Sequence, residues 1–138
     1  MLRIVPDETV LLVIDPQNDY CHEDGNLGQS GVDLSVWHDV TPRIKQLIEL
    51  CRHAGIKDIW SRHYNLAEDA GKAAKRIQAH TAKRKNLSAQ PKTWGSEFVG
   101  ELKPLVDANT TVIEKYRFSV FYGTTLEPML NILGSRLL

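Results

Sequence analysis

Cysteine is scarce in this chain, which has Cys21 and Cys51 among 138 residues. Two cysteines are too few for a disulfide framework, and neither stands in a CxxC or Cys/His spacing typical of a zinc site. We therefore expect both thiols to be reduced. Cys51 falls at helical spacing among apolar residues, which favours a small buried hydrophobe.

The sequence also has little net charge and no long apolar run, and residues 1–8 lack the features of a signal peptide. Lys and Arg number 17, Asp and Glu also 17, so nothing favours nucleic acid or an anionic membrane as a partner. No apolar run approaches the roughly 20 residues of a membrane span. Residues 1–8 have no basic start, apolar middle or small-residue cleavage site. These absences predict a cytoplasmic protein.

What is present is an alternation of strand and helix signals, in a chain of suitable length for a single domain over residues 1–138. Residues 9–14 are apolar without alternation, which predicts a strand buried on both faces of a parallel sheet. Further strands are expected at 56–61 and 110–115. Helices are expected at about 34–54 and 125–133, with Gly55 and Gly134 ending them. The pattern predicts a three-layer α/β/α sandwich of the Rossmann-like kind.

Two segments depart from this alternation. Residues 65–91 are polar and too long for a simple connection, which predicts an insertion that forms a lid. Its basic stretch, Lys72 to Lys85, has little aromatic interleaving and is interpreted as a solvated helical face rather than a nucleic-acid patch. Residues 135–138 are interpreted as the opening of a fourth strand that is cut short.

Asp15 and Lys115 each end a short apolar strand with a charged group. The carboxyl ends of parallel strands meet at one edge of a sheet, where such folds bind their ligands. An acid and a base at that edge predict a catalytic pair. The alternative is a structural ion pair or a helix cap.

Three ordered segments resemble the signatures of the isochorismatase-like cysteine hydrolases: residues 15–25 (DPQNDYCHEDG), 93–97 (TWGSE) and 114–124 (EKYRFSVFYGT). The resemblance implies strand order 3-2-1-4-5-6 and a nucleophilic cysteine at the start of the helix after the fourth strand. The chain stops about one strand before that position. We therefore expect the C-terminal half of the fold to be missing, either from a longer enzyme or from a shortened homologue.

The resemblance also implies the chemistry. A thiol attacks as thiolate, so Asp15 would accept its proton and Lys115 would stabilise the anion. The thiolate would cleave a C–N bond in a small amide, and Thr93, Trp94 and Gly95 favour a ureido or carbamoyl compound. Cys21 is a possible substitute nucleophile, although the favoured interpretation is an ordinary occupant of this motif.

Other residues of the motifs are candidates for a substrate pocket. The related nicotinamidases bind a metal through an Asp-Trp-His run, whereas this chain has His63-Tyr64-Asn65. No metal or other cofactor is therefore expected, and His63 is either a pocket residue or a surface histidine. Four aromatic side chains of the motifs are either pocket walls or core residues: Tyr20, Trp94, Phe121 and Tyr122. We expect Tyr20, Trp94 and Tyr122 to bind the substrate together with His63.

Several alternatives stay open. An isochorismatase that cleaves a vinyl ether would need no cysteine, and a non-catalytic binding or oligomerisation module would need no site at all. A phosphatase of the haloacid dehalogenase type would want an acidic residue where Gln17 stands. A dinucleotide-binding domain lacks its glycine-rich turn after the first strand. We expect a small-molecule substrate and, because the strand order implied by the resemblance leaves one side of the first strand without a partner, a homo-oligomer.

Overall fold

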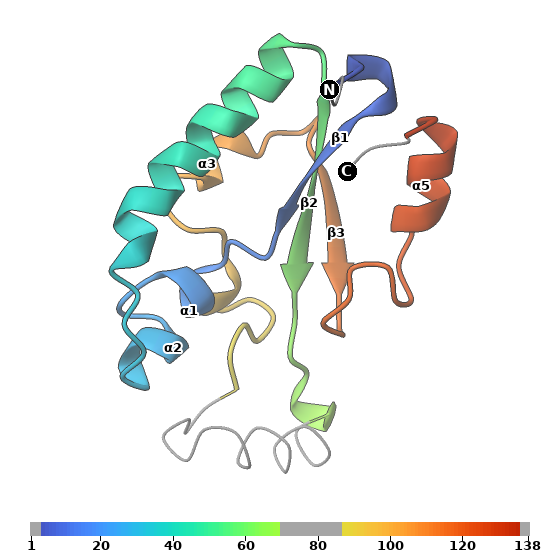
Figure 1. The fold of residues 1–138 in the computed structure, drawn as a ribbon. Coiled ribbons are helices and arrows are strands. Elements are labelled where there is room, and N and C mark those ends of the chain that lie inside the picture. The colour runs from blue at the N-terminus through green and yellow to red at the C-terminus, as the bar shows by residue number, and fades with distance from the viewer. Residues whose placement is uncertain (1–3, 70–86, 136–138) are drawn as a thin grey trace.

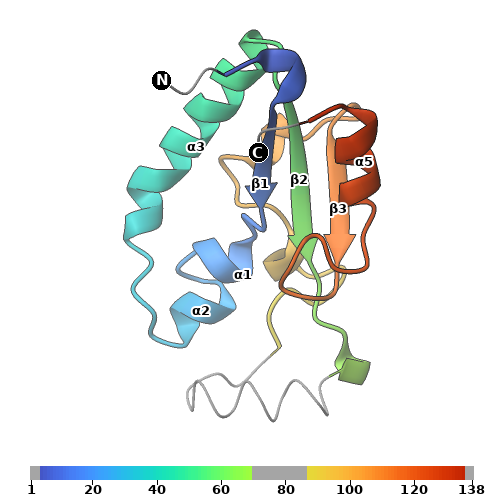
Figure 2. The same ribbon diagram turned by 45° about the vertical axis from the view of Figure 1, so that its right-hand side comes forward.

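A computed structural model describes residues 4–69 and 87–135 of the chain. Its centre is a parallel sheet of three strands, β1 (Val10–Ile14), β2 (Lys57–His63) and β3 (Thr111–Lys115), in the order β1-β2-β3. Helix α3 (Val36–His53) covers one face and helix α5 (Leu126–Ile132) the other, as Figures 1 and 2 both show. The predicted α/β/α layering is confirmed. The order of the three strands matches the first half, 3-2-1, of the expected order 3-2-1-4-5-6.

Each face of the sheet has its own core, because side chains alternate along a strand. On the α3 side, Val13 and Trp60 pack with Ile48 of the helix. On the α5 side, Ile59 and Ile113 pack with Leu126. The odd-numbered residues of β2 and β3 are Cα partners in this register and therefore share the α5 side.

Both covering helices end as the sequence predicts. Gly55 and Gly134 have φ angles of +80° and +64°, which glycine adopts without steric cost. After α3, the N–H of Ile56 donates to the Cys51 carbonyl at 2.8 Å and that of Gly55 to Arg52 at 3.1 Å. These are the two bonds of a Schellman motif, and they turn the chain directly into β2.

The prediction that the first strand is buried on both faces is wrong. Val10 and Val13 are buried, but Leu11 and Leu12 are half-buried and Ile14 is 55% exposed. The reason is the position of β1, which pairs with β2 alone among the described residues and is therefore an edge strand. In the described ranges no strand pairs with its other side.

Short elements complete the described chain. Around the carboxyl edge of the sheet lie α1 (Asn18–Cys21), α2 (Asn26–Gln29) and the 3-10 turn η3 (Trp94–Ser96). The remaining 3-10 turns are η1 (Pro6–Glu8), η2 (Ala67–Asp69) and η4 (Lys103–Leu105). Most of the predicted lid, its basic stretch and all but the first residue of the expected fourth strand lie outside the described residues. No helix in the described part is long and apolar enough to cross a membrane.

Candidate active site

Asp15 follows β1 directly and breaks its alternation. Continued alternation would place the side chain on the α3 side with Val13, whereas Ser61 and Lys115 lie on the α5 side. Instead the backbone of Asp15 adopts φ +52°, a left-handed conformation that aspartate tolerates better than most residues. The turn brings the carboxylate to both partners, which is how a non-glycine residue in this conformation serves a site.

The predicted pair of Asp15 and Lys115 is present. Lys115 Nζ lies 2.5 Å from Asp15 Oδ2, and the lysine side chain is 1% exposed. The ammonium also donates to the carbonyls of Phe118 at 2.8 Å and Arg117 at 3.3 Å. All three contacts are with oxygen, as a buried ammonium requires. Lys115 is thus held between Asp15 and the segment that follows β3.

The second carboxylate oxygen of Asp15 has its own partner. Ser61 Oγ donates to Asp15 Oδ1 at 2.6 Å, and the backbone N–H of Asp15 donates to the Ser61 carbonyl at 3.2 Å. The two oxygens of the carboxylate therefore bind side chains from β2 and β3, which fixes the orientation of the carboxylate. Ser61 was not singled out from the sequence, although it is the last residue of the strand expected at 56–61, a position like those of Asp15 and Lys115.

Gln17 fixes the loop that carries the pair. Its side chain is fully buried, its Nε2 donates to the carbonyls of His63 and Ser96 at 2.9 and 3.0 Å, and its Oε1 accepts from the His63 N–H at 2.7 Å. One side chain thus ties the end of β1 to the end of β2 and to η3. A carboxylate in this position would place an oxygen atom against the His63 and Ser96 carbonyls, which need a donor such as Gln17 Nε2.

Asp19 connects the motif at residues 15–25 to the one at residues 93–97. Its Oδ1 accepts from the N–H of Asn26 at 2.9 Å and its Oδ2 from that of Ala89 at 2.5 Å. Gly95 packs against this carboxylate, so that a Cβ at Gly95 would lie 2.1 Å from Asp19 Oδ2. The glycine of the TWG segment is needed because the two loops approach so closely.

A cavity of about 470 Å³ opens beside Asp15, within the usual range for small-molecule sites. Tyr20 and His63 line it, and the Tyr20 hydroxyl shares a 3.0 Å hydrogen bond with His63 Nδ1. Asn65 Nδ2 donates to the same hydroxyl at 3.3 Å. The other lining residues are mostly apolar and were not predicted from the sequence: Ile14, Leu27, Leu34, Trp37 and Phe118, with Cys21.

Trp94 and Tyr122 are not among the described residues that line this cavity. Trp94 is 48% exposed and meets His22 edge to face at 5.1 Å between ring centroids. Tyr122 is 69% exposed, and Phe121 is 46% exposed. Trp94, Phe121 and Tyr122 were expected at the site because they belong to motifs that contain site residues. Membership of a motif does not fix the direction of a side chain.

Cys21 lines the cavity, and its surroundings disfavour the thiolate form. Burial, together with the negative charge of Asp15, raises the pKa of its thiol to about 12. The thiolate is therefore scarce at neutral pH, which argues against Cys21 as a nucleophile. The pKa of Cys51 is also raised, by burial and by Asp58, and this cysteine lies on α3.

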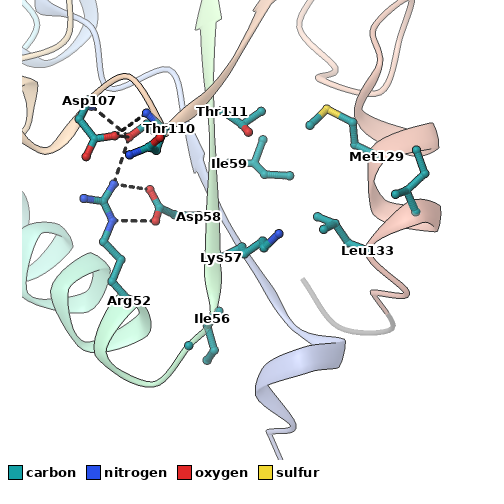
Figure 3. Close-up of a pocket in the computed structure, with 13 residues that line it drawn as sticks. Arg52, Ile56, Lys57, Asp58, Ile59, Asp107, Thr110, Thr111, Met129 and Leu133 are labelled. Carbon is teal, nitrogen blue, oxygen red and sulfur yellow. Dashed lines mark hydrogen bonds and ion pairs between the residues drawn. The ribbon is translucent and has the colours of Figure 1, made fainter.

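A second cavity, of about 560 Å³, lies at the amino-terminal edge of the sheet (Figure 3). On one side of β2, Arg52 donates to both carboxylate oxygens of Asp58 at 2.8 and 2.7 Å. Arg52 also donates to the carbonyl of Leu105 at 2.9 Å. On the other side stand Met129 and Leu133 of the α5 region. The charged groups on the first side bind each other, and we interpret them as structural.

Metal binding has no candidate in the part of the chain that the structure describes, since no three His, Cys, Asp or Glu side chains gather there in a suitable group. The site consists of a buried ammonium, a carboxylate and a mostly apolar cavity with a few directed polar groups. Such a site can exchange a proton with a bound nucleophile and stabilise charge beside it.

The chain is similar to proteins of a known family. Residues 9–136 match the family model described as "Isochorismatase domain". Ureidoacrylate amidohydrolase RutB of Acinetobacter baylyi is 32% identical over 146 residues, which cover 98% of this chain and 59% of that protein. RutB of Serratia proteamaculans is 32% identical over 147 residues, with coverage of 96% and 57%. The chain thus spans well under two thirds of these relatives.

Solved structures share the fold. A cysteine hydrolase from Pseudomonas syringae pv. phaseolicola superposes with a TM-score of 0.73 at 20% identity, covering 98% of this chain and 59% of that one. N-carbamoylsarcosine amidase from Thermoplasma acidophilum gives 0.70 at 25% identity, with coverage of 93% and 63%. Nicotinamidase PncA from Bacillus subtilis gives 0.71 at 22%, with coverage of 93% and 66%.

Proposed function

Because the chain belongs to the isochorismatase family, we propose that Asp15 and Lys115 form the proton-handling part of a site that hydrolyses a small amide. One observation carries the proposal: a buried ammonium lies 2.5 Å from a carboxylate that lines a cavity of small-molecule size. A pair that served stability alone would have no need of the cavity. The finer proposal is a ureido or carbamoyl substrate, which the names of the RutB and N-carbamoylsarcosine amidase relatives support.

In the proposed reaction Asp15 takes the proton of an attacking thiol. The thiolate adds to the substrate carbonyl, and the collapse of this adduct breaks the C–N bond. The departing amine or ammonia takes the proton back from the Asp15 carboxyl group. A thioester remains, and water hydrolyses it to the acid and the free thiol. Lys115 stabilises negative charge on the sulfur and keeps the carboxylate oriented.

The proposal gives the nucleophile to a residue outside these 138. Cys21 has a pKa of about 12, whereas an attacking thiol works best when its pKa lies near the ambient pH. Cys51 lies in the α3 helix and senses the charge of Asp58, which belongs to the opposite edge of the sheet. The described site thus supplies the acid–base and electrostatic groups of the reaction.

A second candidate is hydrolysis of a vinyl ether, the reaction of isochorismatase itself. The observation that favours it is the absence of a suitable thiol among the two cysteines of the sequence. Asp15 would then act on the substrate directly.

The test compares the 138-residue chain with the product of the complete reading frame that contains it. Both are assayed for ammonia release from a panel of ureido, carbamoyl and simple amide compounds. We expect turnover from the reading-frame product and its loss after treatment with iodoacetamide. In the active protein, Asp15→Asn and Lys115→Met should each lower kcat/KM by about 10²-fold or more.

The matched control is Lys103→Met, which removes a lysine from an exposed ion pair with Glu97. Its kcat/KM should stay at the wild-type level. Turnover of amides that survives Asp15→Asn at full rate would refute the proposal. Cleavage of a vinyl ether that iodoacetamide leaves untouched would favour the second candidate.

A further inference from the structure

The turn after β1 is bonded to the end of β2 at two places. In the first, the N–H of Asp15 donates to the Ser61 carbonyl at 3.2 Å. In the second, Gln17 uses its side-chain amide: Oε1 accepts from the His63 N–H at 2.7 Å, and Nε2 donates to the His63 carbonyl at 2.9 Å. These bonds resemble those between peptide groups of neighbouring strands. The backbone of the turn is therefore fixed by bonds that do not involve the Asp15 carboxylate.

The Asp15 carboxylate is held by fewer bonds than the backbone that carries it. Lys115 Nζ contacts Oδ2 at 2.5 Å. This single contact does not set the rotation about the Cβ–Cγ bond, which in aspartate has broad energy wells. The 2.6 Å bond from the Ser61 hydroxyl to Oδ1 supplies the second fixed point. The plane of the carboxylate, and with it the direction in which a proton can approach, therefore depends on Ser61.

The hydroxyl of Ser61 is suited to this task by its burial and its chemistry. Ser61 is 2% exposed, and its one hydroxyl hydrogen is used in the bond to Asp15. Because the hydroxyl is neutral, its removal leaves the charges of Asp15 and Lys115 in place. Lys115, in contrast, also binds the carbonyls of Arg117 and Phe118. Ser61 can therefore be replaced with a more selective effect on the carboxylate than Lys115.

We propose that Ser61 is a positioning residue, which sets the plane of the Asp15 carboxylate for proton transfer. The inference rests on the proposed amide hydrolysis. In it the proton of the thiol passes to Asp15, the electron pair of the S–H bond stays on the sulfur, and the departing amine later takes the proton. Both transfers require a directed hydrogen bond. Ser61 is not among the described residues that line the cavity, so it should affect the reaction and leave substrate binding unchanged.

The first measurement is steady-state ammonia release by the reading-frame product from the amide of the panel that it hydrolyses fastest. Ser61→Ala should lower kcat by about tenfold and leave KM within about twofold of wild type, since the lost bond matters in the transition state. Ser61→Thr keeps a hydroxyl on a β-branched side chain, which suits a strand. It should bring kcat back to within about threefold of wild type.

The second measurement changes the leaving group and uses the p-nitrophenyl ester of the same acid. p-Nitrophenolate departs without taking a proton, whereas an amine must take one from Asp15. Ser61→Ala should therefore lower kcat/KM by about tenfold for the amide and by less than about threefold for the ester. The ratio of the two values does not depend on how much of each variant is folded. A general disturbance of the structure would slow both substrates equally.

Ser30→Ala is the matched control, because it removes a hydroxyl bond of the same length, 2.6 Å to the Asn26 carbonyl, from a residue that does not line the described cavity. Its kcat and its ratio of amide to ester hydrolysis should equal those of wild type. An unchanged kcat or ratio in Ser61→Ala overturns the proposal, as does a Ser61→Thr variant as slow as Ser61→Ala. Amide hydrolysis that Asp15→Asn leaves at full rate would refute the proposed reaction itself.

Discussion

At the residue scale, the site depends on the backbone of Asp15. A regular strand would direct this carboxylate to the α3 side, where Arg62 lies over the ring of Phe98 at 4.5 Å. The left-handed turn at φ +52° directs it to Ser61 and Lys115 instead. Residues held in this region cost free energy that the surrounding bonds must offset. Here the offsetting bonds come from β2, β3 and Gln17.

The state of Cys21 gives a prediction at the same scale. Because its pKa is raised to about 12 by burial and by Asp15, the folded protein should resist alkylation of this thiol between pH 7 and 9. In a Cys51→Ser variant, where Cys21 is the single thiol, we expect iodoacetamide to react at least tenfold more slowly with folded than with urea-unfolded protein. Mass spectrometry of timed samples measures both rates.

Cys21→Ser should also leave kcat/KM of the active protein within about twofold of wild type, since serine is similar in size and the thiol takes no part in the reaction. Rapid alkylation of the folded variant at pH 7, or loss of activity in Cys21→Ser, would make Cys21 the nucleophile after all.

At the element scale, the opposite edge of the sheet is held by Arg52 and Asp58. The pair joins the last turn of α3 to β2, and Arg52 also reaches the Leu105 carbonyl ahead of β3. The Asp58 side chain is 8% exposed. Burial opposes its ionisation, but bonds from Arg52 and Trp60 outweigh this and hold the pKa of the carboxyl below its ordinary value.

Arg52→Met should therefore lower the free energy of unfolding at pH 7 by about 2 kcal/mol, because it leaves the mostly buried Asp58 carboxylate without its cation. Arg52 is partly exposed, so the loss should be smaller than for a fully buried ion pair. A lowered folded pKa stabilises the protein above the unfolded value, near 4, and this contribution disappears as pH falls through the folded value. The difference in the free energy of unfolding between wild type and variant should be largest at neutral pH and should become smaller below pH 4.

Urea denaturation at pH 7 and pH 3.5 measures this gap. Lys103→Met breaks an ion pair whose members are 59% and 47% exposed, so its loss should be within about 1 kcal/mol. A gap for Arg52→Met that grew in acid would contradict the assigned cause.

At the scale of the whole molecule, the unpaired side of β1 is the dominant feature. The strand is apolar throughout, and among the described residues it has a neighbour on one side only. Ile14, at the end of the strand, is 55% exposed. Exposed apolar edges pair with other chains. The expectation of self-association follows from this edge.

We therefore expect the 138-residue chain to associate or precipitate at micromolar concentration, as measured by light scattering after size-exclusion chromatography. Ile14→Lys places a charge beside the edge and should shift the chain toward monomer. Leu50→Lys adds the same charge on an exposed part of α3 and should leave association unchanged. A monomeric wild-type chain that unfolds cooperatively would refute this expectation.

The sequence by itself determined the layering, the parallel sheet, both helix ends and the meeting of Asp15 with Lys115. These features depend on local signals: apolar strands that end in a charge, a 3.6-residue periodicity, and glycines where the backbone turns left-handed. Such signals act within a few residues along the chain and are legible without the fold.

Only the tertiary structure decided which neighbours each residue has. The tertiary structure placed β1 at the edge of the described sheet. The burial of a strand depends on what pairs and packs with it, and its own apolar sequence does not decide this. The tertiary structure turned Asp15 across the sheet, paired it with Ser61, and directed Phe118 to the cavity while Trp94 and Tyr122 were directed elsewhere. Side-chain direction follows from packing between segments distant in sequence, and no local pattern records it.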